Sequence, residues 1–246
     1  FCERIDKQPA SPIVRLIRYS YKSMQLLRVI LYLFSMPLSK DKKQKLKKLK
    51  APKYNPIKGI DSSLFALHNS NEGLDAVGSG PISIQYKLAP LPPPLLQSCM
   101  DMFEDNMGQL YSDSSWGLNL PEKRAELDHN DARFLLVMSG DDDKKEGSLV
   151  GYCHFRFDTD DDDDPKELVG YVYELQVSKD FQGHGVGRRL MDIVHEVAKK
   201  ASLSKVMLTV FDANEGAARF YNTLGYVIDE LSPGEEADYK MMSKTM

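Results

Sequence analysis

A glycine-rich turn between a strand and a helix restricts the fold of this chain more than any other feature of its sequence. The turn is Gln182-Gly183-His184-Gly185-Val186-Gly187, and an apolar run ending at Val177 precedes it. Residues 186–201 then carry apolar side chains at the spacing of one helical face. These are Leu190, Met191, Val194, Val197, Ala198 and Ala201. Glycines let the backbone approach a ligand without Cβ clashes, and the free N–H groups of a helix N-terminus attract an anion. With Arg188 and Arg189 at the same end, the turn predicts a phosphate-binding site.

The spacing of the glycines excludes two common types of phosphate-binding site. A dinucleotide-binding G-x-G-x-x-G pattern fails because Arg188 stands where the third glycine would fall, and Walker A fails because no G-K-[ST] follows. The pattern that fits is Q-x-x-G-x-G, at Gln182, Gly185 and Gly187. A glycine-rich turn that binds nothing remains the alternative.

A second pattern lies downstream of the turn. Asn214, Ala217, Phe220-Tyr221 and Gly225-Tyr226 fit N-x-x-A-x-x-F-Y-x-x-x-G-F/Y. The two patterns, in this order and at this separation, resemble the GNAT acetyltransferases. The resemblance implies a GNAT fold that binds acetyl-coenzyme A as cosubstrate, with the pyrophosphate at the glycine-rich turn and Asn214 beside the pantetheine arm.

The order of the expected elements indicates the fold class. From Ile82 onward, alternating and helical apolar periods succeed one another. The expected strands are 82–86, 133–139, 149–158, 167–177, 206–211, 226–230 and 239–242, and the expected helices are 95–111, one after Pro121, 186–201 and 215–224. Hairpins before Val177 imply antiparallel pairing, and strand–helix–strand–helix after it implies parallel pairing. We therefore expect an α/β (α+β) domain with a mixed central sheet of about six to seven strands and helices on both faces.

The N-terminal third has a different composition. Residues 1–35 are basic and apolar and predict an upstream or targeting-like extension that is disordered, either a transit peptide or translated upstream sequence. Residues 36–80 hold a Lys-rich segment and a linker, and residues 81–246 the acetyltransferase domain. The lysine cluster at 40–53 is typical of nuclear-localisation or polyanion-binding segments, or of a solvated helix.

Charge is distributed unevenly along the chain. Up to Lys53 there are fourteen Lys or Arg against three Asp or Glu, a net charge of +11, and the formal total of −4 leaves −15 for the rest (11 − 15 = −4). An acidic body attracts cationic substrates and repels polyanions, so we expect no stable complex with nucleic acid. The alternative is that this charge only keeps the domain soluble.

Cysteine, histidine and hydropathy patterns favour an intracellular protein without a metal. The three cysteines are scattered, and the five histidines lack the spacing of metal ligands. We expect neither disulfides nor a metal site, and a reducing compartment. The longest uncharged apolar run, Val29 to Phe34, is too short to span a bilayer, so we expect no membrane span.

Within the GNAT superfamily, residues 95–242 resemble the N-terminal acetyltransferase D (NatD) family. The resemblance rests on Tyr111 to Gly117, on HFRFD at 154–158, on Tyr171-x-Tyr173-Glu174-Leu175-Gln176, and on VMLTVF at 206–211. A KKQK motif at 42–45 adds to it and favours Met36 as the start of the protein. The chain departs from the family in its acidic Asp160–Asp164 run, in a 232–238 segment without cysteines, and in Gln182 at the first motif position.

The NatD resemblance implies an activity and its setting. It implies transfer of acetyl to the N-terminal amine of histones of the 4 and 2A classes, which begin Ser-Gly-Arg-Gly. Histone N-terminal peptides are then the partners, the nucleus and the cytoplasm the location, and we expect a monomer.

The resemblance also implies roles for individual residues. The catalytic residues are Glu174, Tyr173 and Tyr221. The cofactor contacts are Leu175, Gln176, Val177, Gln182, Gly183, His184, Gly185, Val186, Gly187, Arg188 and Asn214. The peptide contacts are Tyr111, Trp116, Asp158, Tyr171, Thr209 and Tyr239.

The chemistry of acetyl transfer agrees with these residue types. A protonated α-amine must lose a proton before it attacks, and Glu174 interrupts an apolar strand beside the turn, where burial would raise the pKa of its carboxyl. The alternative is a buried carboxylate paired with Arg188 or Arg189. A backbone N–H near Val177 suits the developing oxyanion. Tyr221 is either the acid for the leaving thiolate or a core aromatic.

Two carboxylates are candidates for holding a substrate arginine. Asp158 and Asp113 could each form a bidentate pair with a guanidinium, the alternative being solvated loop carboxylates. Three other functions stay open: a GNAT enzyme for lysine side chains or small amines, an acetyl-CoA-binding module without turnover, and a nucleic-acid binder acting through the lysine cluster.

Overall fold

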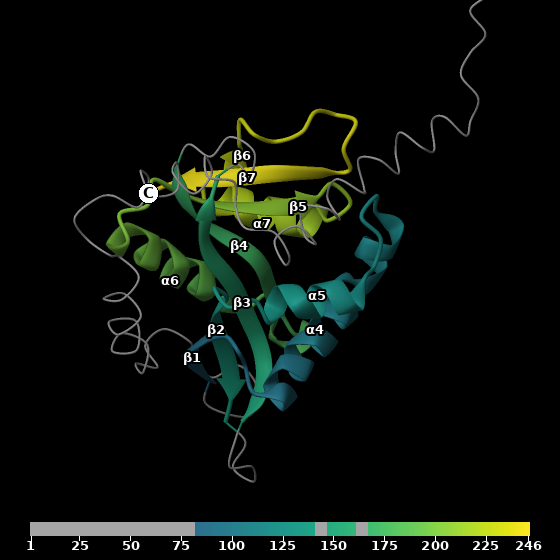
Figure 1. Cartoon of the computed structure of the whole chain (residues 1–246), viewed down its shortest axis with the longest axis vertical. Coiled ribbons are helices and arrows are strands. Elements are labelled where there is room, and N and C mark those ends of the chain that lie inside the picture. The colour runs from purple at the N-terminus through teal and green to yellow at the C-terminus, as the bar shows by residue number, and fades with distance from the viewer. Residues whose placement is uncertain (1–81, 141–146, 161–166) are drawn as a thin grey trace, which may run out of the picture. The chain divides into compact units, whose positions relative to one another are not determined.

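In the described residues, seven strands form one open sheet that helices cover on both faces (Figure 1). The computed structural model describes residues 82–140, 147–160 and 167–246. The predicted segments 1–35 and 36–80 lie outside the described residues, as do 161–166, most of the acidic run. The strands are β1 (Ile82–Leu88), β2 (Arg133–Ser139), β3 (Ser148–Thr159), β4 (Leu168–Val177), β5 (Lys205–Phe211), β6 (Val227–Ile228) and β7 (Tyr239–Thr245). The helices are α4 (Pro93–Asp113), α5 (Leu120–Leu127), α6 (Val186–Lys200) and α7 (Glu215–Thr223), with a short 3-10 turn at Lys179–Phe181.

The side chains of β2 show why both faces are covered. Phe134 and Leu136 pack with residues of α4 and α5, whereas Leu135 and Val137 pack with residues of α6. All four side chains are fully buried. Each face of the sheet therefore has its own apolar core, and the predicted α/β architecture with helices on both faces is confirmed.

The predicted parallel pairing after Val177 is limited to one pair of strands. The sheet order is β1-β2-β3-β4-β5-β7-β6, and β1 to β4 pair antiparallel. Among the strands that the structure describes, only β4 and β5 pair in parallel, over Gly170–Val172 and Val206–Leu208. The last strand, β7, lies between β5 and β6 and pairs antiparallel with both. The prediction was wrong for β5 and β6, because β7 pairs along the full length of β5 and separates them.

A β-bulge in β4 decides which side chains face α4 and α5. Pairing with β3 passes from His154↔Glu174 to Phe155↔Val172, so Tyr173 is an extra residue on β4. Consequently Val172 and Leu175, three positions apart, both pack against the core on the α6 side. Glu174 and Gln176 are left on the opposite face, together with Tyr173.

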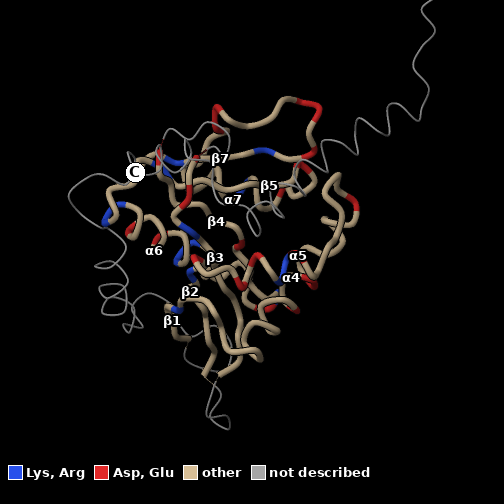
Figure 2. The backbone as a smooth tube through the Cα atoms, in the orientation of Figure 1, with Lys and Arg blue, Asp and Glu red and all other residues tan. Residues whose placement is uncertain are grey.

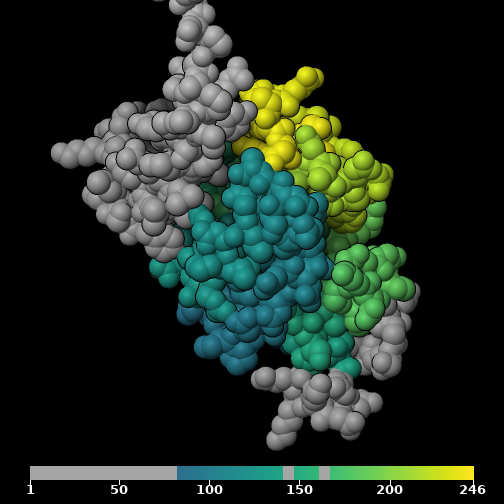
Figure 3. All heavy atoms as spheres, turned by 90° about the vertical axis from the view of Figure 1, so that its right-hand side faces the viewer, coloured from purple at the N-terminus to yellow at the C-terminus, as the bar shows by residue number. Residues whose placement is uncertain are grey.

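The loop between β6 and β7 meets the loop between α4 and α5. Ser115 donates hydrogen bonds to the Asp238 carboxylate from its backbone N (2.5 Å) and from Oγ (2.8 Å). In Figure 3 the teal surface of α4 and α5 adjoins the yellow surface of the C-terminal region. Figure 2 shows acidic positions along the β6–β7 loop, which carries five Asp or Glu and no Lys or Arg over residues 229–238.

Candidate active site

The candidate site lies where β4 and β5 diverge. Their pairing ends at Val172 and Leu208, while β5 stays paired with β7 as far as Phe211. Ser178 N–H donates to Val150 O of β3 at 2.9 Å, and successive N–H groups of a strand point to opposite sides. The N–H of Val177 therefore points away from β3, toward the divergence, as an oxyanion donor requires.

The glycine-rich turn has the geometry that its sequence predicts. Gly183 and Gly185 have φ of +77° and +82°, and a Cβ added to either would meet nothing within 4 Å. Gly185 is the N-cap of α6, and its carbonyl accepts from Arg189 N–H at 2.9 Å. The N–H groups of residues 186–188 precede that bond and are available to an anion. The turn thus offers donors beside open space.

The other residues around the turn have separate structural roles. Val186 is buried in the core, so only its backbone can face a ligand, whereas His184 is exposed. Gly187 faces α7, where an added Cβ would lie 3.4 Å from Phe220 Cζ, an ordinary van der Waals contact. Gln182 Nε2 donates to Val177 O at 2.9 Å, and the Arg188 guanidinium donates to Thr223 Oγ1 at 3.4 Å.

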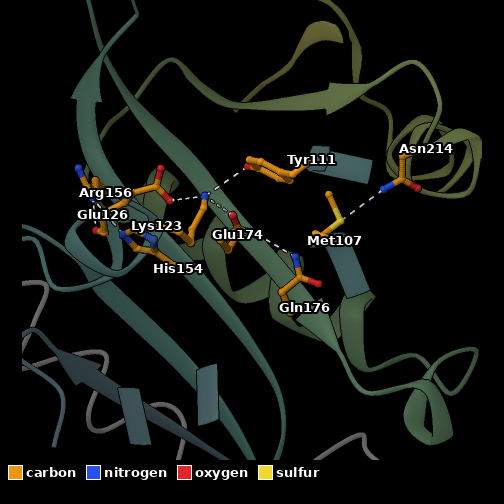
Figure 4. Close-up of polar contacts among 9 residues, drawn as sticks. All are labelled: Met107, Tyr111, Lys123, Glu126, His154, Arg156, Glu174, Gln176 and Asn214. Atoms are coloured by element: carbon orange, nitrogen blue, oxygen red, sulfur yellow. Dashed lines mark hydrogen bonds and ion pairs between the residues drawn. The ribbon is translucent and has the colours of Figure 1, made fainter. Parts of the chain in front are cut away.

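Asn214 caps helix α7 and also points toward α4. Its Oδ1 accepts from Ala217 N–H at 3.1 Å, which satisfies one free donor of the first turn. Its Nδ2 lies 3.8 Å from Met107 Sδ (Figure 4). The Asn214 amide thus has a structural role as the cap of α7, in addition to any contact with a cofactor.

Glu174 is a buried carboxylate that accepts hydrogen bonds at both oxygens. Its side chain is 4% exposed, Oε1 lies 2.6 Å from Lys123 Nζ, and Oε2 accepts from Gln176 Nε2 at 2.7 Å (Figure 4). Burial raises the pKa of Glu174, and the ammonium of Lys123 opposes the rise. The expectation of burial is thus confirmed. The alternative, a buried carboxylate in an ion pair with Arg188 or Arg189, was right about the ion pair and wrong about the partner, because α5 presents Lys123 to this face of β4.

Gln176 connects the base candidate to helix α4. Its Oε1 accepts from Asn106 Nδ2 at 3.1 Å, and Asn106 also donates to Val177 O at 3.0 Å. With its own Nε2 on Glu174, the Gln176 side chain fixes the orientation of that carboxylate. Leu175, between Glu174 and Gln176 in the chain, turns its partly buried side chain to the core on the α6 side.

A group of tyrosines continues from Glu174 along β4. Tyr173 O–H donates to Asp158 Oδ2 at 2.8 Å, and Tyr171 Oη lies 2.6 Å from Thr209 Oγ1. The rings of Tyr171 and Tyr173 are 5.0 Å apart, and Arg156 lies over the Tyr173 ring at 4.2 Å. The structure thus brings three of the expected peptide contacts, Asp158, Tyr171 and Thr209, together with Tyr173, which was expected to be catalytic.

An aromatic cluster forms a second group. Tyr111, Trp116, Phe211 and Tyr239 meet edge to face, with ring centroids 5.0 to 6.1 Å apart. Trp116 is 39% exposed, so the cluster borders solvent. The Ser115–Asp238 contact joins the α4–α5 loop, which carries Trp116, to the residue before Tyr239, the first residue of β7. Asp113 is exposed and accepts from Gln109 of its own helix at 2.9 Å, which matches the solvated alternative.

The sequence model of the Acetyltransferase (GNAT) family matches residues 96–226, which is more than half of the chain. This chain belongs to the GNAT acetyltransferase family. The enzymes of this family are acetyltransferases that use acetyl-CoA. The glycine-rich turn fits acetyl-CoA, because the free N–H groups of the first turn of α6 follow open space beside Gly183 and Gly185. Val177 and the turn residues would hold the cosubstrate.

Two relatives and one solved structure illustrate the likeness. The chain is 38% identical over 69 residues to an uncharacterized N-acetyltransferase of Methanocaldococcus jannaschii, 28% of this chain and 30% of that one. It is 29% identical over 107 residues to the mycothiol acetyltransferase of Rhodococcus jostii, 44% of this chain and 33% of that one. It therefore spans about a third of these relatives. NAA60 of Arabidopsis thaliana, solved with a bisubstrate analogue, shares the fold at a TM-score of 0.50 and 13% identity, over 67% of this chain and 99% of that one.

Tyr221, the expected acid of this GNAT domain, lies in the core. It is 8% exposed and packs against Phe220 and Tyr226, with ring centroids 5.2 and 5.7 Å away. Burial raises its pKa, so its hydroxyl stays protonated near neutral pH. This environment agrees with the core alternative. A raised pKa makes the hydroxyl a weaker acid, so the role of Tyr221 as proton donor stays a prediction.

Several residues of the candidate site were not among the sequence predictions. They are Asn106, Lys123, Glu126 and Phe211. Lys123 and Glu126 stand at helical spacing in a charged helix, which normally indicates a solvated face.

In the described part of the chain, no group of three His, Cys, Asp or Glu could hold a metal ion. No helix in those residues is long and apolar enough to cross a membrane.

Proposed function

We propose that this GNAT enzyme acetylates the N-terminal α-amine of histones of the 4 and 2A classes, whose chains begin Ser-Gly-Arg-Gly. The observation that carries the proposal is a buried, hydrogen-bonded Glu174 between the strand divergence and the tyrosine group. Such a carboxylate can remove a proton from an amine that reaches it along the tyrosines.

The reaction takes two protons from the ammonium form of the amine and returns one to the thiolate, so one proton leaves to solvent. A protein α-amine has a pKa of about 7.7–8, and Glu174 takes the first proton through a water and passes it to solvent. The neutral amine nitrogen attacks the thioester carbon and the C–N bond forms. Glu174 then takes the second proton from the nitrogen of the tetrahedral intermediate, and the C–S bond breaks. Val177 N–H stabilises the oxyanion, and the leaving thiolate takes a proton from Tyr221. A positioned base contributes about 10²–10⁴-fold to such a step.

The acidic surroundings favour a basic N-terminal peptide. Asp158 accepts one bond at each oxygen, from Thr159 N–H and from Tyr173 O–H, and keeps lone pairs for a substrate arginine. The β6–β7 loop adds acidic residues without a basic one. A histone tail, with arginine at its third position, matches this charge, and histones as substrates imply action in the nucleus and the cytoplasm.

A peptide assay tests the proposal. The protein is incubated with acetyl-CoA and a Ser-Gly-Arg-Gly-Lys peptide, and the acetyl group is located by fragmentation. We expect acetyl on the serine α-amine and none on a matched peptide with a blocked N-terminus. Acetyl on the internal lysine of both peptides would refute the N-terminal assignment.

Acetylation of a small amine is the second candidate. Mycothiol acetyltransferases are among the relatives, one of them, of Propionibacterium freudenreichii, 37% identical over 84 residues. A panel of small amines, assayed beside the peptide, separates the two functions. Turnover of a small amine with a higher kcat/KM than that of the peptide would favour this candidate.

A further inference from the structure

Helix α5 buries a lysine against the candidate base. Lys123 is 7% exposed, and its Nζ lies 2.6 Å from Glu174 Oε1, 2.7 Å from Glu126 Oε1 and 3.3 Å from Tyr111 Oη (Figure 4). The rings of Phe103 and Tyr111 face the same nitrogen at 4.8 and 5.2 Å. The ammonium is therefore held from α4, α5 and β4 at once.

We infer that Lys123 is a positioning residue that keeps Glu174 ionised for proton removal, with Glu126 as the carboxylate that stays paired to Lys123 while Glu174 gains and loses its proton. The inference rests on the proposed role of Glu174 as the base. It gives α5 a part in the reaction that its sequence, a short charged helix, does not suggest.

The contacts explain why two carboxylates share one lysine. A buried carboxylate without a cation takes up a proton, because burial disfavours its charge. Lys123 counteracts this at Glu174. When Glu174 takes a proton from the substrate, a lysine with no other partner would be a buried unpaired charge, which is costly. Glu126, whose side chain is 27% exposed, continues to neutralise it.

Apart from the cation Arg156, the remaining titratable groups around Glu174 are uncharged at neutral pH. Arg156 on β3 donates to His154 Nε2 at 3.2 Å and to the backbone carbonyl of Glu126. The uncharged groups come from α4, β3 and α7 and are Tyr111, Tyr152, Cys153, His154 and Tyr221, with Cys99 beside Tyr152. Burial raises the pKa values of the tyrosines and cysteines. Burial and the nearby Arg156 lower that of His154. Burial also lowers the pKa of Lys123, but its two carboxylates outweigh this and place it well above the ordinary value. Lys123 and Glu126 thus set the charge state of Glu174.

The inference predicts shifts of opposite sign in the pH profile of kcat for peptide acetylation. Lys123→Met should move the acidic limb upward by about 1–3 pH units, because an opposite charge at this distance lowers a carboxyl pKa by that amount. On the acidic limb, below both pKa values, kcat should fall about 10- to 1000-fold, which is the same shift expressed as a rate, and it should recover at higher pH. Glu126→Gln should move the limb downward, because it removes a like charge. Lys123→Arg, which keeps the cation, should leave the limb near its original position.

An ion-paired and largely buried lysine elsewhere in the sheet provides the matched control. Lys205 begins β5, at the far end of that strand from Phe211, and is ion-paired with Asp229 at 3.2 Å and Glu167 at 3.4 Å. Lys205→Met removes a paired, largely buried lysine but should leave the kcat limb unmoved.

The outcomes separate this inference from the proposed function. If folded Lys123→Met loses activity by one factor at every pH, or if Lys123→Arg shifts the limb as far as Lys123→Met does, the inference is overturned. If Lys123→Met does not fold, the kcat profile of Glu126→Gln tests the inference instead. An acidic limb that is unmoved or shifted upward in Glu126→Gln overturns the inference. Glu174→Gln at full rate would overturn the base assignment as well, whereas an inactive Glu174→Gln with an unmoved Lys123→Met limb would remove only the role of Lys123.

Discussion

Gly185→Ala should weaken acetyl-CoA binding far more than it weakens the fold. Gly185 has φ +82°, and a residue with a Cβ in that left-handed region costs about 1–2 kcal/mol. No atom lies within 4 Å of the added Cβ, so backbone strain is the whole cost to the fold. That is a modest part of a typical stability of about 5–15 kcal/mol. In the proposed complex, however, the methyl group enters the space of the diphosphate.

Gly117 provides a control with the same backbone conformation. It has φ +70°, nothing within 4 Å of an added Cβ, and no place in the glycine-rich turn. Titration calorimetry with acetyl-CoA should show a Kd raised at least tenfold, about 1.4 kcal/mol, for Gly185→Ala and an unchanged Kd for Gly117→Ala. Thermal unfolding should show similar losses for both variants. Equal acetyl-CoA affinity in the two variants would refute the assignment of the turn.

Three further predictions concern the peptide side and the proton donor. Asp158→Asn should raise KM at least tenfold for Ser-Gly-Arg-Gly-Lys, about 1.4 kcal/mol, and leave the KM of a Ser-Gly-Ala-Gly-Lys peptide nearly unchanged; equal effects on both would exclude an arginine contact. Asp238→Ala removes both bonds to Ser115 and should raise peptide KM several-fold while acetyl-CoA affinity, measured in parallel, stays constant. A peptide KM equal to that of the parent would show that the two loops do not shape the slot. Tyr221→Phe should lower kcat about tenfold or more if the hydroxyl supplies the proton. Loss of thermal stability with full kcat would assign Tyr221 to the core.

Local sequence patterns predicted the elements of this fold well. The turn at 182–187 and the buried face of α6 were predicted because glycine conformations and helical periodicity are local properties. The limits of β2, 133–139, agree with the structure for the same reason. The place of β7 between β5 and β6 depends on long-range pairing, which no local pattern records.

The site itself was predicted only in part. Tyr171, Tyr173, Glu174 and Asp158 gather as the resemblance implies, but a plain period of two would place Glu174 on the face of Val172. The bulge at Tyr173 reverses this, and it depends on register with β3 rather than on composition. Lys123 could not be recognised, because a lysine in a charged helix is normally solvated.

Single-turnover acetyl transfer by Glu174→Gln tests the central claim most directly. The substitution keeps the shape of the side chain and removes the base, and it leaves the glycine-rich turn untouched. Near neutral pH, transfer to the Ser-Gly-Arg-Gly-Lys peptide should fall by about 10²–10⁴-fold, while the Kd for acetyl-CoA stays close to that of the parent protein. A transfer rate equal to that of the parent, with acetyl on the same α-amine, would contradict the account.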